Sequence, residues 1–384
     1  MDCLVIGCGL SGAVVARFLA EECNKKVVIW DRRSHIAGNM YDCNDEHGIL
    51  IHKYGPHTFH TKERYLYDYV RRFAKWKEFK LTCMAKIDGK CTPTPFNFTT
   101  IDAYYSENDA NRLKKRIKEV FGDQETATVV ELLESKDTYI QEFAEFLFQK
   151  DYSLYTAKQW GIPAKEVDPS ILKRVPVRFS YKNGYFDDAY QVMPEKSYVS
   201  FFEGLLNHNN INVELGIESL HHLQISNDNQ LLLNGAINNK PVIYTGALDE
   251  LLSMQYGSLP YRTLQFDWKF ENIESFQDAP VVAYPQAPDY TRITEYKKLP
   301  VQNVQGTTYA VEYSLKYEHR RSMEPYYPVL TEQSIRQYEQ YRERAKKIKN
   351  LFFCGRLADF KYYNMDQALK RALELCNELK SYIN

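Results

Sequence analysis

The sequence lacks the features of several large classes of protein. No apolar run in its 384 residues approaches the length of about 20 residues that a helix needs to cross a bilayer. The chain enters an apolar strand pattern at once, without the basic leader and longer apolar stretch of a secretory signal. Internal repeats and low-complexity tracts are missing as well. We therefore expect a globular, cytoplasmic protein without a membrane span.

Cysteine is present without a pattern that signals disulfides or zinc. None of the 8 cysteines forms a C-x-x-C pair, and several lie in apolar segments, where a free thiol behaves as a small hydrophobic side chain. The cysteines are Cys3, Cys8, Cys23, Cys43, Cys83, Cys91, Cys354 and Cys376. We expect reduced thiols and no metal site.

An excess of charge of one sign is also missing. The 49 Lys and Arg residues balance the 50 Asp and Glu residues, which leaves a formal net charge of −1. This balance gives no reason to expect nucleic acid or an anionic membrane as a partner. The basic run in residues 112–118 is interpreted as a solvated helix face. With 44% hydrophobic residues, the chain is long enough for two or three globular domains.

The most informative stretch is the first forty residues. Its elements are an apolar segment at 3–6, then Gly7, Gly9 and Gly12, a helix pattern at 13–22, a second apolar segment at 27–30, and Asp31. The first glycine permits a tight turn, the second lets a pyrophosphate approach the backbone, and the third lets the helix pack on the strand. The helix N-terminus offers N–H groups to phosphates, and the acidic residue can accept a hydrogen bond from a ribose hydroxyl. The spacing predicts a dinucleotide-binding unit.

A second glycine turn follows Asp31 closely, with Gly38 and Asn39 in the run DRRSHIAGN. Two such loops suit a ligand whose phosphates run past both, which is more typical of FAD than of NAD. Further along, Asp88-Gly89 predicts a hairpin, residues 101–150 show helical patterns, and residues 261–270, 279–284, 292–296 and 307–312 alternate like antiparallel strands.

At residues 52–61, HKYGPHTFHT, the chain resembles the UDP-galactopyranose mutase family, flavoenzymes that interconvert the six- and five-membered ring forms of UDP-galactose. Further sequence motifs similar to those of the family follow in the family's order along nearly the whole chain. This ordered set is far more specific than any single motif. The further blocks are residues 155–161, 174–179, 183–186, 242–246, 259–264, 291–297 and 355–357.

The resemblance implies an α/β fold with a Rossmann-like FAD-binding domain, a helical insertion and an antiparallel β-sheet substrate domain. Residues 1–75, 195–250 and 335–384 would form a discontinuous FAD-binding domain. Residues 100–175 would form the helical domain, with a mobile lid around residues 165–180. Residues 76–99, 176–194 and 251–334 would form the sheet domain.

The resemblance also implies roles for individual residues. Arg174 and Arg292 align with the arginines that clamp the diphosphate, a task that suits planar, permanently charged guanidinium groups. His60 is assigned to the neighbourhood of the sugar and flavin N5, and it completes the expected catalytic set. Tyr155 aligns with the residue that stacks on uracil. The expected substrate-binding residues are Asn97, Tyr155, Trp160, Arg174, Tyr185, Arg292, Tyr327, Tyr362 and Asn364. The expected cofactor-binding residues are Gly7, Gly9, Leu10, Ser11, Gly12, Asp31, Arg32, Gly38, Asn39, His57, Gly246, Gly355, Arg356 and Met365.

In the family, N5 of reduced FAD attacks the anomeric carbon, and the sugar ring opens and recloses from the N5–sugar adduct without net redox change. The resemblance therefore implies FAD that is active when reduced, a UDP-sugar substrate, an external reductant such as NAD(P)H, and a homodimer. The expected function is interconversion of UDP-galactopyranose and UDP-galactofuranose for cell-surface polysaccharide biosynthesis.

Three positions depart from the family pattern near the sugar or base. Ala283 stands where the family has Asn, Asn364 replaces a carboxylate of the substrate site, and Asp151 replaces one of the two aromatic residues that usually precede Tyr155. The flavin-facing and phosphate-clamping residues persist, so we expect the chemistry to be kept. UDP-galactose is the default substrate, and UDP-N-acetylgalactosamine or another nucleotide sugar is the alternative.

Two other classes share the dinucleotide fold, a flavin oxidoreductase of the amine-oxidase type and a catalytically silent flavin-binding protein. The block at residues 155–160 and the paired arginines favour the mutase over the oxidase, because an amine substrate has no diphosphate to clamp.

Overall fold

The computed structural model describes residues 1–161, 163, 175–319 and 323–383, and its centre is a five-stranded parallel sheet. The strand order is β12 (Ile211–Leu215), β2 (Val27–Asp31), β1 (Cys3–Ile6), β16 (Val242–Tyr244) and β22 (Leu351–Phe353). All four pairings are parallel, and β1 is fully buried at the middle of the sheet. Buried apolar runs of this kind are typical of parallel strands covered on both faces. The Rossmann-like fold predicted from the first forty residues is confirmed.

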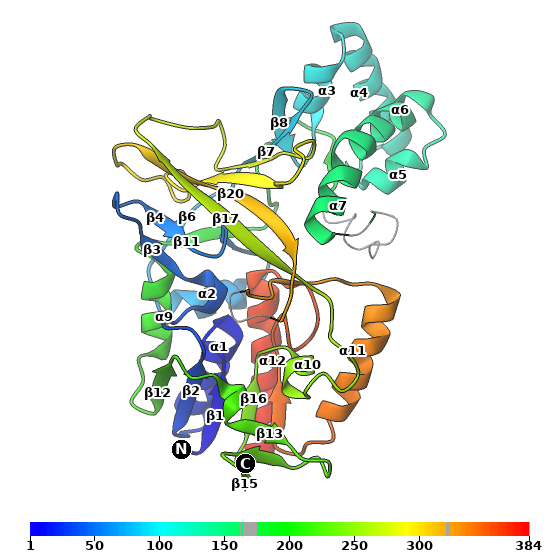
Figure 1. The fold of residues 1–384 in the computed structure, drawn as a ribbon. Helices are drawn as coiled ribbons and strands as arrows, with labels where there is room; N and C mark the ends of the chain where they lie inside the picture. Colours follow the sequence, from blue (N-terminus) through cyan, green and yellow to red (C-terminus); the bar gives the residue numbers. More distant parts are fainter. Residues whose placement is uncertain (162, 164–174, 320–322, 384) are drawn as a thin grey trace.

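Helices surround this sheet in the lower part of Figure 1. They are α1 (Leu10–Glu21), α2 (Arg64–Arg71), α9 (Tyr198–Leu206), α10 (Leu248–Leu251), α11 (Glu332–Ala345) and α12 (Met365–Ile383). The last helix buries Leu369, Ala372, Leu375, Cys376 and Leu379, an i, i+3 and i+4 stripe that packs against α1. This contact brings the C-terminal helix back onto the first βαβ unit.

A second, seven-stranded sheet lies between these helices and the upper helical part of the molecule (Figure 1). Its order is β21 (Tyr327–Pro328), β17 (Tyr261–Glu271), β20 (Thr307–Lys316), β19 (Arg292–Glu295), β18 (Val281–Ala283), β7 (Cys83–Ile87) and β8 (Lys90–Thr94). The pairings are antiparallel except that β7 and β18 run parallel. The hairpin predicted at Asp88-Gly89 is confirmed, and both turn residues have positive φ, 46° and 82°.

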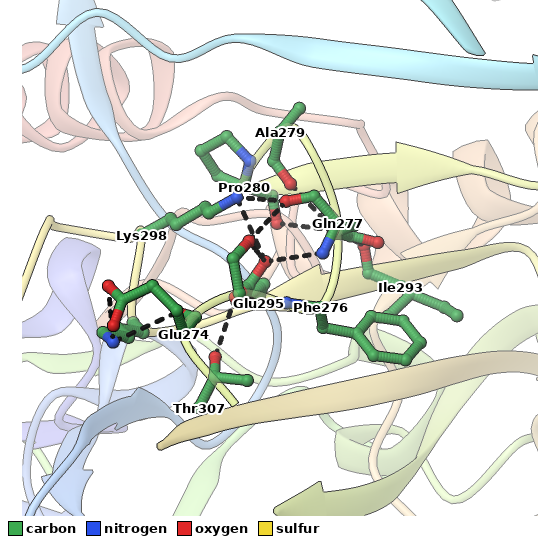
Figure 2. Close-up of polar contacts among 11 residues, drawn as sticks. Glu274, Phe276, Gln277, Ala279, Pro280, Ile293, Glu295, Lys298 and Thr307 are labelled. Atoms are coloured by element: carbon green, nitrogen blue, oxygen red, sulfur yellow. Dashed lines mark hydrogen bonds and ion pairs between the residues drawn. The ribbon is translucent and has the colours of Figure 1, made fainter. Parts of the chain in front are cut away.

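A buried carboxylate fastens the loop between β17 and β18 to this sheet (Figure 2). Glu295, at the end of β19, is 0% exposed and accepts hydrogen bonds from the backbone N–H groups of Phe276 at 3.0 Å and Gln277 at 3.1 Å. The Thr307 hydroxyl donates to it at 2.8 Å, and the Lys298 ammonium lies 3.4 Å away. A buried charge needs such partners, so this cluster fixes the loop between β17 and β18 against β19 and β20.

The helical part contains α3 (Phe98–Tyr104), α4 (Glu107–Phe121), α5 (Val129–Leu133), α6 (Thr138–Leu147), the π-helical turn η2 (Phe148–Tyr152) and α7 (Ser153–Trp160). The helical patterns predicted for residues 101–150 are thus confirmed. The basic run on α4 is paired with acidic side chains, with Lys114 lying 2.6 Å from Asp102 and Arg116 lying 3.4 Å from Asp137. Pairing of this kind agrees with its interpretation as a solvated face.

Smaller sheets complete the fold. The strand β11 (Tyr190–Pro194) lies between β5 (Phe59–Thr61) and β6 (Trp76–Glu78), so this sheet joins segments on either side of the predicted domain boundary at residues 75 and 76. The remaining short elements are β3 (Asp42–Asn44), β4 (Leu50–His52), β9 (Thr126–Ala127), β10 (Val177–Arg178), β13 (Leu223–Ile225), β14 (Leu231–Leu233), β15 (Ala236–Ile237) and the 3-10 turns η1 (Gly38–Met40) and η4 (Ser219–His221). All eight cysteines are free, and no helix within the described ranges is long and apolar enough to cross a bilayer.

Candidate active site

The first cavity lies at the carboxyl ends of the parallel strands, where ligands of open α/β sheets bind. Segments that follow β1, β2, β16 and β22 line it. Its wall includes almost every residue predicted to bind the cofactor: Gly7, Gly9, Leu10, Ser11, Asp31, Arg32, Gly38, Asn39, His57, Gly246, Gly355, Arg356 and Met365. Gly12 does not line the cavity; it serves the packing behind it.

The glycine geometry fits a pyrophosphate-binding turn. Gly7 has φ +102°, and a Cβ on Gly12 would lie 2.0 Å from the Gly7 carbonyl oxygen. A Cβ on Gly38 would lie 2.8 Å from the Gly9 Cα, so the two glycine turns meet. No side chain in the described structure caps the N-terminus of α1, which leaves its first N–H groups available to a phosphate. The residues present therefore fit a dinucleotide.

Two carboxylates, those of Asp31 and Glu324, line this cavity. Asp31 accepts hydrogen bonds from the Cys8 N–H at 2.7 Å and the Arg33 N–H at 2.9 Å, so it fixes the glycine loop as well as lining the wall. Glu324 pairs with Arg32 at 2.6 Å and with Arg33 at 3.0 Å. Burial opposes the charge of Glu324, but the two arginines outweigh it and hold the pKa of that carboxyl below its usual value. Sequence reasoning missed Glu324, which stands outside every recognised motif.

A second cavity opens from the first, and the two share the lining residues Asn39, His57, Tyr326, Arg356, Asn364 and Met365. Its wall brings together most of the residues predicted to contact substrate: His60, Tyr155, Trp160, Tyr185, Arg292, Tyr327, Tyr362 and Asn364. These residues come from β5, α7, β19, β21 and the loops that precede β11 and α12. A group bound across the shared residues would face both cavities.

Aromatic rings of the second cavity pack around Arg356, which lines both cavities. Tyr327 and Tyr362 are stacked with ring centroids 5.3 Å apart, and Trp160 lies 6.1 Å from each. The Arg356 guanidinium lies 5.3 Å from the centroid of Tyr327 and 5.1 Å from that of Tyr362. Its Nη2 donates to the Tyr363 carbonyl oxygen at 2.7 Å, which fixes its orientation. Stacked rings with a cation suit a sugar or base that carries negative charge nearby.

Arg292 supplies a second fixed cation. Its Nε and Nη2 donate to the same carboxylate oxygen of Glu312 at 2.9 Å and 2.8 Å, and the Glu312 side chain is 1% exposed. Burial opposes the charge of Arg292, but Glu312 and neighbouring groups outweigh it and hold its pKa well above the usual value. The guanidinium therefore stays charged at the cavity wall. Glu312 was missed because it lies within the alternating strand β20.

The two predicted histidines have different surroundings. The His60 Nδ1 lies 2.7 Å from the Asp188 carboxylate, and its ring stacks on Phe186 with centroids 3.5 Å apart. His57 Nδ1 contacts the Gly55 carbonyl oxygen at 2.7 Å, and burial lowers the pKa of His57 to about 4. His57 is therefore neutral near neutral pH. Asp188 joins the site from 128 residues away, and sequence reasoning missed it.

Asn97 is the one described residue of the predicted substrate set that lies away from the second cavity. Asn97 is fully buried and does not line the cavity; it is the N-cap of α3, and its amide donates to the Lys182 carbonyl oxygen at 3.0 Å and to the Asn183 side chain at 2.8 Å. Asn followed by Thr three residues later is a helix N-cap signal, which the assignment of Asn97 to the substrate did not take into account. Arg174 and most of the proposed lid lie outside the described residues.

The departures from the family pattern at Asp151, Ala283 and Asn364 all line the second cavity. Within the described residues, no cluster of His, Cys, Asp or Glu is arranged to hold a metal.

A family model for UDP-galactopyranose mutase matches residues 150–362, and one for an NAD(P)-binding Rossmann-like domain matches residues 5–73. The chain is 34% identical to a dTDP-fucopyranose mutase of Escherichia coli, over 98% of this chain and 97% of that protein. It is 32% identical to a UDP-galactopyranose mutase of Mycoplasma pneumoniae, over 98% of this chain and 96% of that one.

The chain belongs to the UDP-galactopyranose mutase family. Its fold agrees: a crystal structure of reduced UDP-galactopyranose mutase superposes with a TM-score of 0.74 at 15% identity, over 99% of this chain and 94% of that one. Putrescine oxidase has a related fold, with a TM-score of 0.58 at 12% identity over 99% of each chain. Membership in the family makes the chain a mutase, and the fold supplies its dinucleotide site.

Proposed function

We propose that this mutase interconverts the pyranose and furanose forms of UDP-galactose with FAD as its cofactor. The observation that carries the proposal is the junction of the two cavities, where a dinucleotide site opens directly onto a pocket walled by tyrosines and fixed arginines. Reduced FAD, when bound, supplies an electron-rich ring nitrogen that can attack an anomeric carbon.

In this proposal the chain itself positions the substrate and stabilises charge. Arg292, held by Glu312, would neutralise the negative charge that develops on the departing diphosphate. Tyr155 would stack on the base, while Trp160, Tyr327 and Tyr362 would exclude water from the sugar. His60 would contact the sugar, oriented through its Nδ1 by Asp188.

A further cation for the diphosphate, besides Arg292, is proposed from the sequence. Arg174 would contact the diphosphate together with Arg292. Arg174→Ala should then lower turnover well over tenfold with the flavin still bound, because each such donor contributes a few kcal/mol to the transition state. Near-normal turnover would contradict the role of this arginine. A homodimer and reduction by NAD(P)H are further parts of the proposal.

A second candidate substrate is a dTDP-linked sugar. The similarity to a dTDP-fucopyranose mutase favours it, and so do Asp151, Ala283 and Asn364, which line the cavity at positions that depart from the family pattern. UDP-N-acetylgalactosamine stays a third candidate on the same residues.

The test is incubation of the purified flavoprotein with UDP-galactose, UDP-N-acetylgalactosamine and a dTDP-sugar, each with and without dithionite, followed by chromatography for the furanose isomer. Product that forms only after reduction supports the proposal, and the preferred nucleotide selects the substrate. Turnover of an amine with release of peroxide would instead favour an oxidase.

A further inference from the structure

The substrate cavity carries one acidic side chain among the described residues that line it, that of Asp151. Asp151 lies in the π-helical turn η2, which continues directly into α7. Such turns interrupt a helix at a cost and occur frequently at functional sites. Asp151 and Tyr155 stand four residues apart on this helix, the spacing that places side chains on one face, and both line the cavity.

No described residue forms a hydrogen bond with the Asp151 carboxyl group. The described cation whose charge acts on Asp151 is Lys158, whose ammonium donates to the carbonyl oxygens of Tyr284 at 2.6 Å and of Ala287 and Tyr290, each at 2.8 Å. An ammonium has three N–H groups, so this lysine is fully occupied with the loop after β18. Asp151 is half-buried in the cavity wall, so its carboxyl group is partly withdrawn from water without a partner among the described residues, which points to a ligand as its partner.

Position 283 on β18 offers no polar side chain to the cavity. Ala283 on β18 lines the same cavity and packs in one apolar cluster with Tyr152 and Phe96. The family pattern places an Asn at this strand position and an aromatic ring at position 151. This chain therefore carries its hydrogen-bonding group on the helix instead of the strand.

We propose that Asp151 reads the base of the nucleotide sugar, by hydrogen bonding to the imide edge of a uracil or thymine stacked on Tyr155. The inference rests on the proposed function and makes Asp151 its specificity-determining residue. The imide edge presents one N–H donor beside carbonyl acceptors. A neutral carboxyl group matches it with one acceptor and one donor, whereas a carboxylate matches the N–H alone and repels the carbonyl oxygens.

Burial supports the neutral form, because it raises the pKa of Asp151 to about 7 and Lys158 only partly offsets it. Base recognition should therefore weaken as pH rises through this value. Lys158, Tyr104 and Tyr152 interact electrostatically with Asp151. Further titratable groups line the same cavity: His57, His60, Cys83, Tyr155, Tyr185 and Arg292. Comparison of variants at position 151 separates its titration from theirs.

The experiment is calorimetric titration of UDP-galactose, a dTDP-sugar, a CDP-sugar and a GDP-sugar into the oxidised, flavin-loaded protein across this pH range. Sugar diphosphates are fully ionised throughout, so the ligand itself does not titrate. We compare the wild type with Asp151→Asn, whose amide offers the same donor and acceptor at every pH, and with Asp151→Leu. Asp123→Asn, at an exposed position after α4, is the matched control.

We expect the wild type and the control to lose affinity for the UDP- or dTDP-sugar several-fold as pH rises. Asp151→Asn should bind without this pH dependence, within about threefold of the wild type at low pH, and Asp151→Leu should bind at least about tenfold more weakly throughout. The inference is overturned if Asp151→Leu binds like the wild type, if Asp151→Asn keeps the pH dependence, or if the CDP- or GDP-sugar binds most tightly. Absence of binding by every nucleotide sugar to the wild type would refute the proposed function itself.

Discussion

Substitution of Arg292 can separate the two tasks that the structure gives this residue. The side chain lines the substrate cavity, and it is also the charge partner of Glu312, which is 1% exposed. A simple alanine variant would confuse these tasks, because an inactive protein could be either catalytically impaired or destabilised. The magnitude of each effect follows from the geometry.

Arg292→Ala leaves the Glu312 carboxylate buried without a counter-charge, which costs about 3–5 kcal/mol. Unfolding gains roughly 2.1 cal/mol/K per residue, so for a cooperative transition of 384 residues this loss lowers the Tm by about 4–6 °C. The double variant Arg292→Met/Glu312→Leu removes both charges. We expect most of the lost Tm to return, because apolar residues often replace a buried ion pair at little cost.

Both variants lack the guanidinium in the cavity, so both should lose turnover by about 10²–10³-fold. The assays are thermal melts of the flavin-loaded protein by circular dichroism and mutase turnover under dithionite. Arg336→Ala is the control, because its pair with Glu332 is exposed and contributes less than about 1 kcal/mol. Recovery of turnover in the double variant would refute a direct role for Arg292, and an unchanged Tm in the single variant would refute the charge argument.

Three further predictions concern the cofactor side and the sheet. Gly12→Ala should not yield folded flavoprotein, because its Cβ would lie 2.0 Å from a carbonyl oxygen, whereas Gly9→Ala, with its nearest atom at 3.8 Å, should fold and retain less flavin, measured by absorbance after desalting. Glu295→Leu should lower the Tm by several degrees, because four hydrogen-bond donors, among them the Ser275 hydroxyl, lose their buried acceptor. Lys298→Met should lower the Tm as well, because the 0% exposed carboxylate then lacks its counter-charge. Arg356→Lys should weaken nucleotide-sugar binding by about 0.5–2 kcal/mol in calorimetry, through loss of guanidinium stacking.

The dinucleotide site could be predicted from the sequence because its requirements fall on the backbone. A positive φ at Gly7 and the close approach of Gly12 to the preceding strand can be met by glycine alone, so the residue type records the geometry. The hairpin at Asp88-Gly89 also has a backbone signal, because both turn residues have positive φ, which Asp and Gly adopt more readily than most residues. A backbone conformation that only a few residue types can adopt can be predicted from the residues at that position.

The partners of the functional side chains left no such signature. Asp188 reaches His60 across 128 residues, and Glu324 reaches Arg32 across 292. Glu312 stands in an alternating strand, where an acidic residue reads as solvent-facing although it is buried. Each pairing depends on how distant strands and loops meet, which a single sequence does not encode locally. The family motifs identified the members of these pairs that were assigned to ligands, and they missed the acidic partners that hold them.

The two cavities therefore differ in how well their lining residues tolerate substitution. Cofactor binding relies on glycine turns, where a substitution brings a Cβ against backbone, as at Gly12 and Gly38. The part of the substrate cavity around Asp151 and Ala283 is built from side chains, and these two differ from the family pattern. Selection for a new nucleotide should act at that part first, because its residues carry little of the fold. Departures from the family pattern at these positions, beside an intact cofactor site, fit a mutase whose chemistry is kept while its choice of base is set by Asp151.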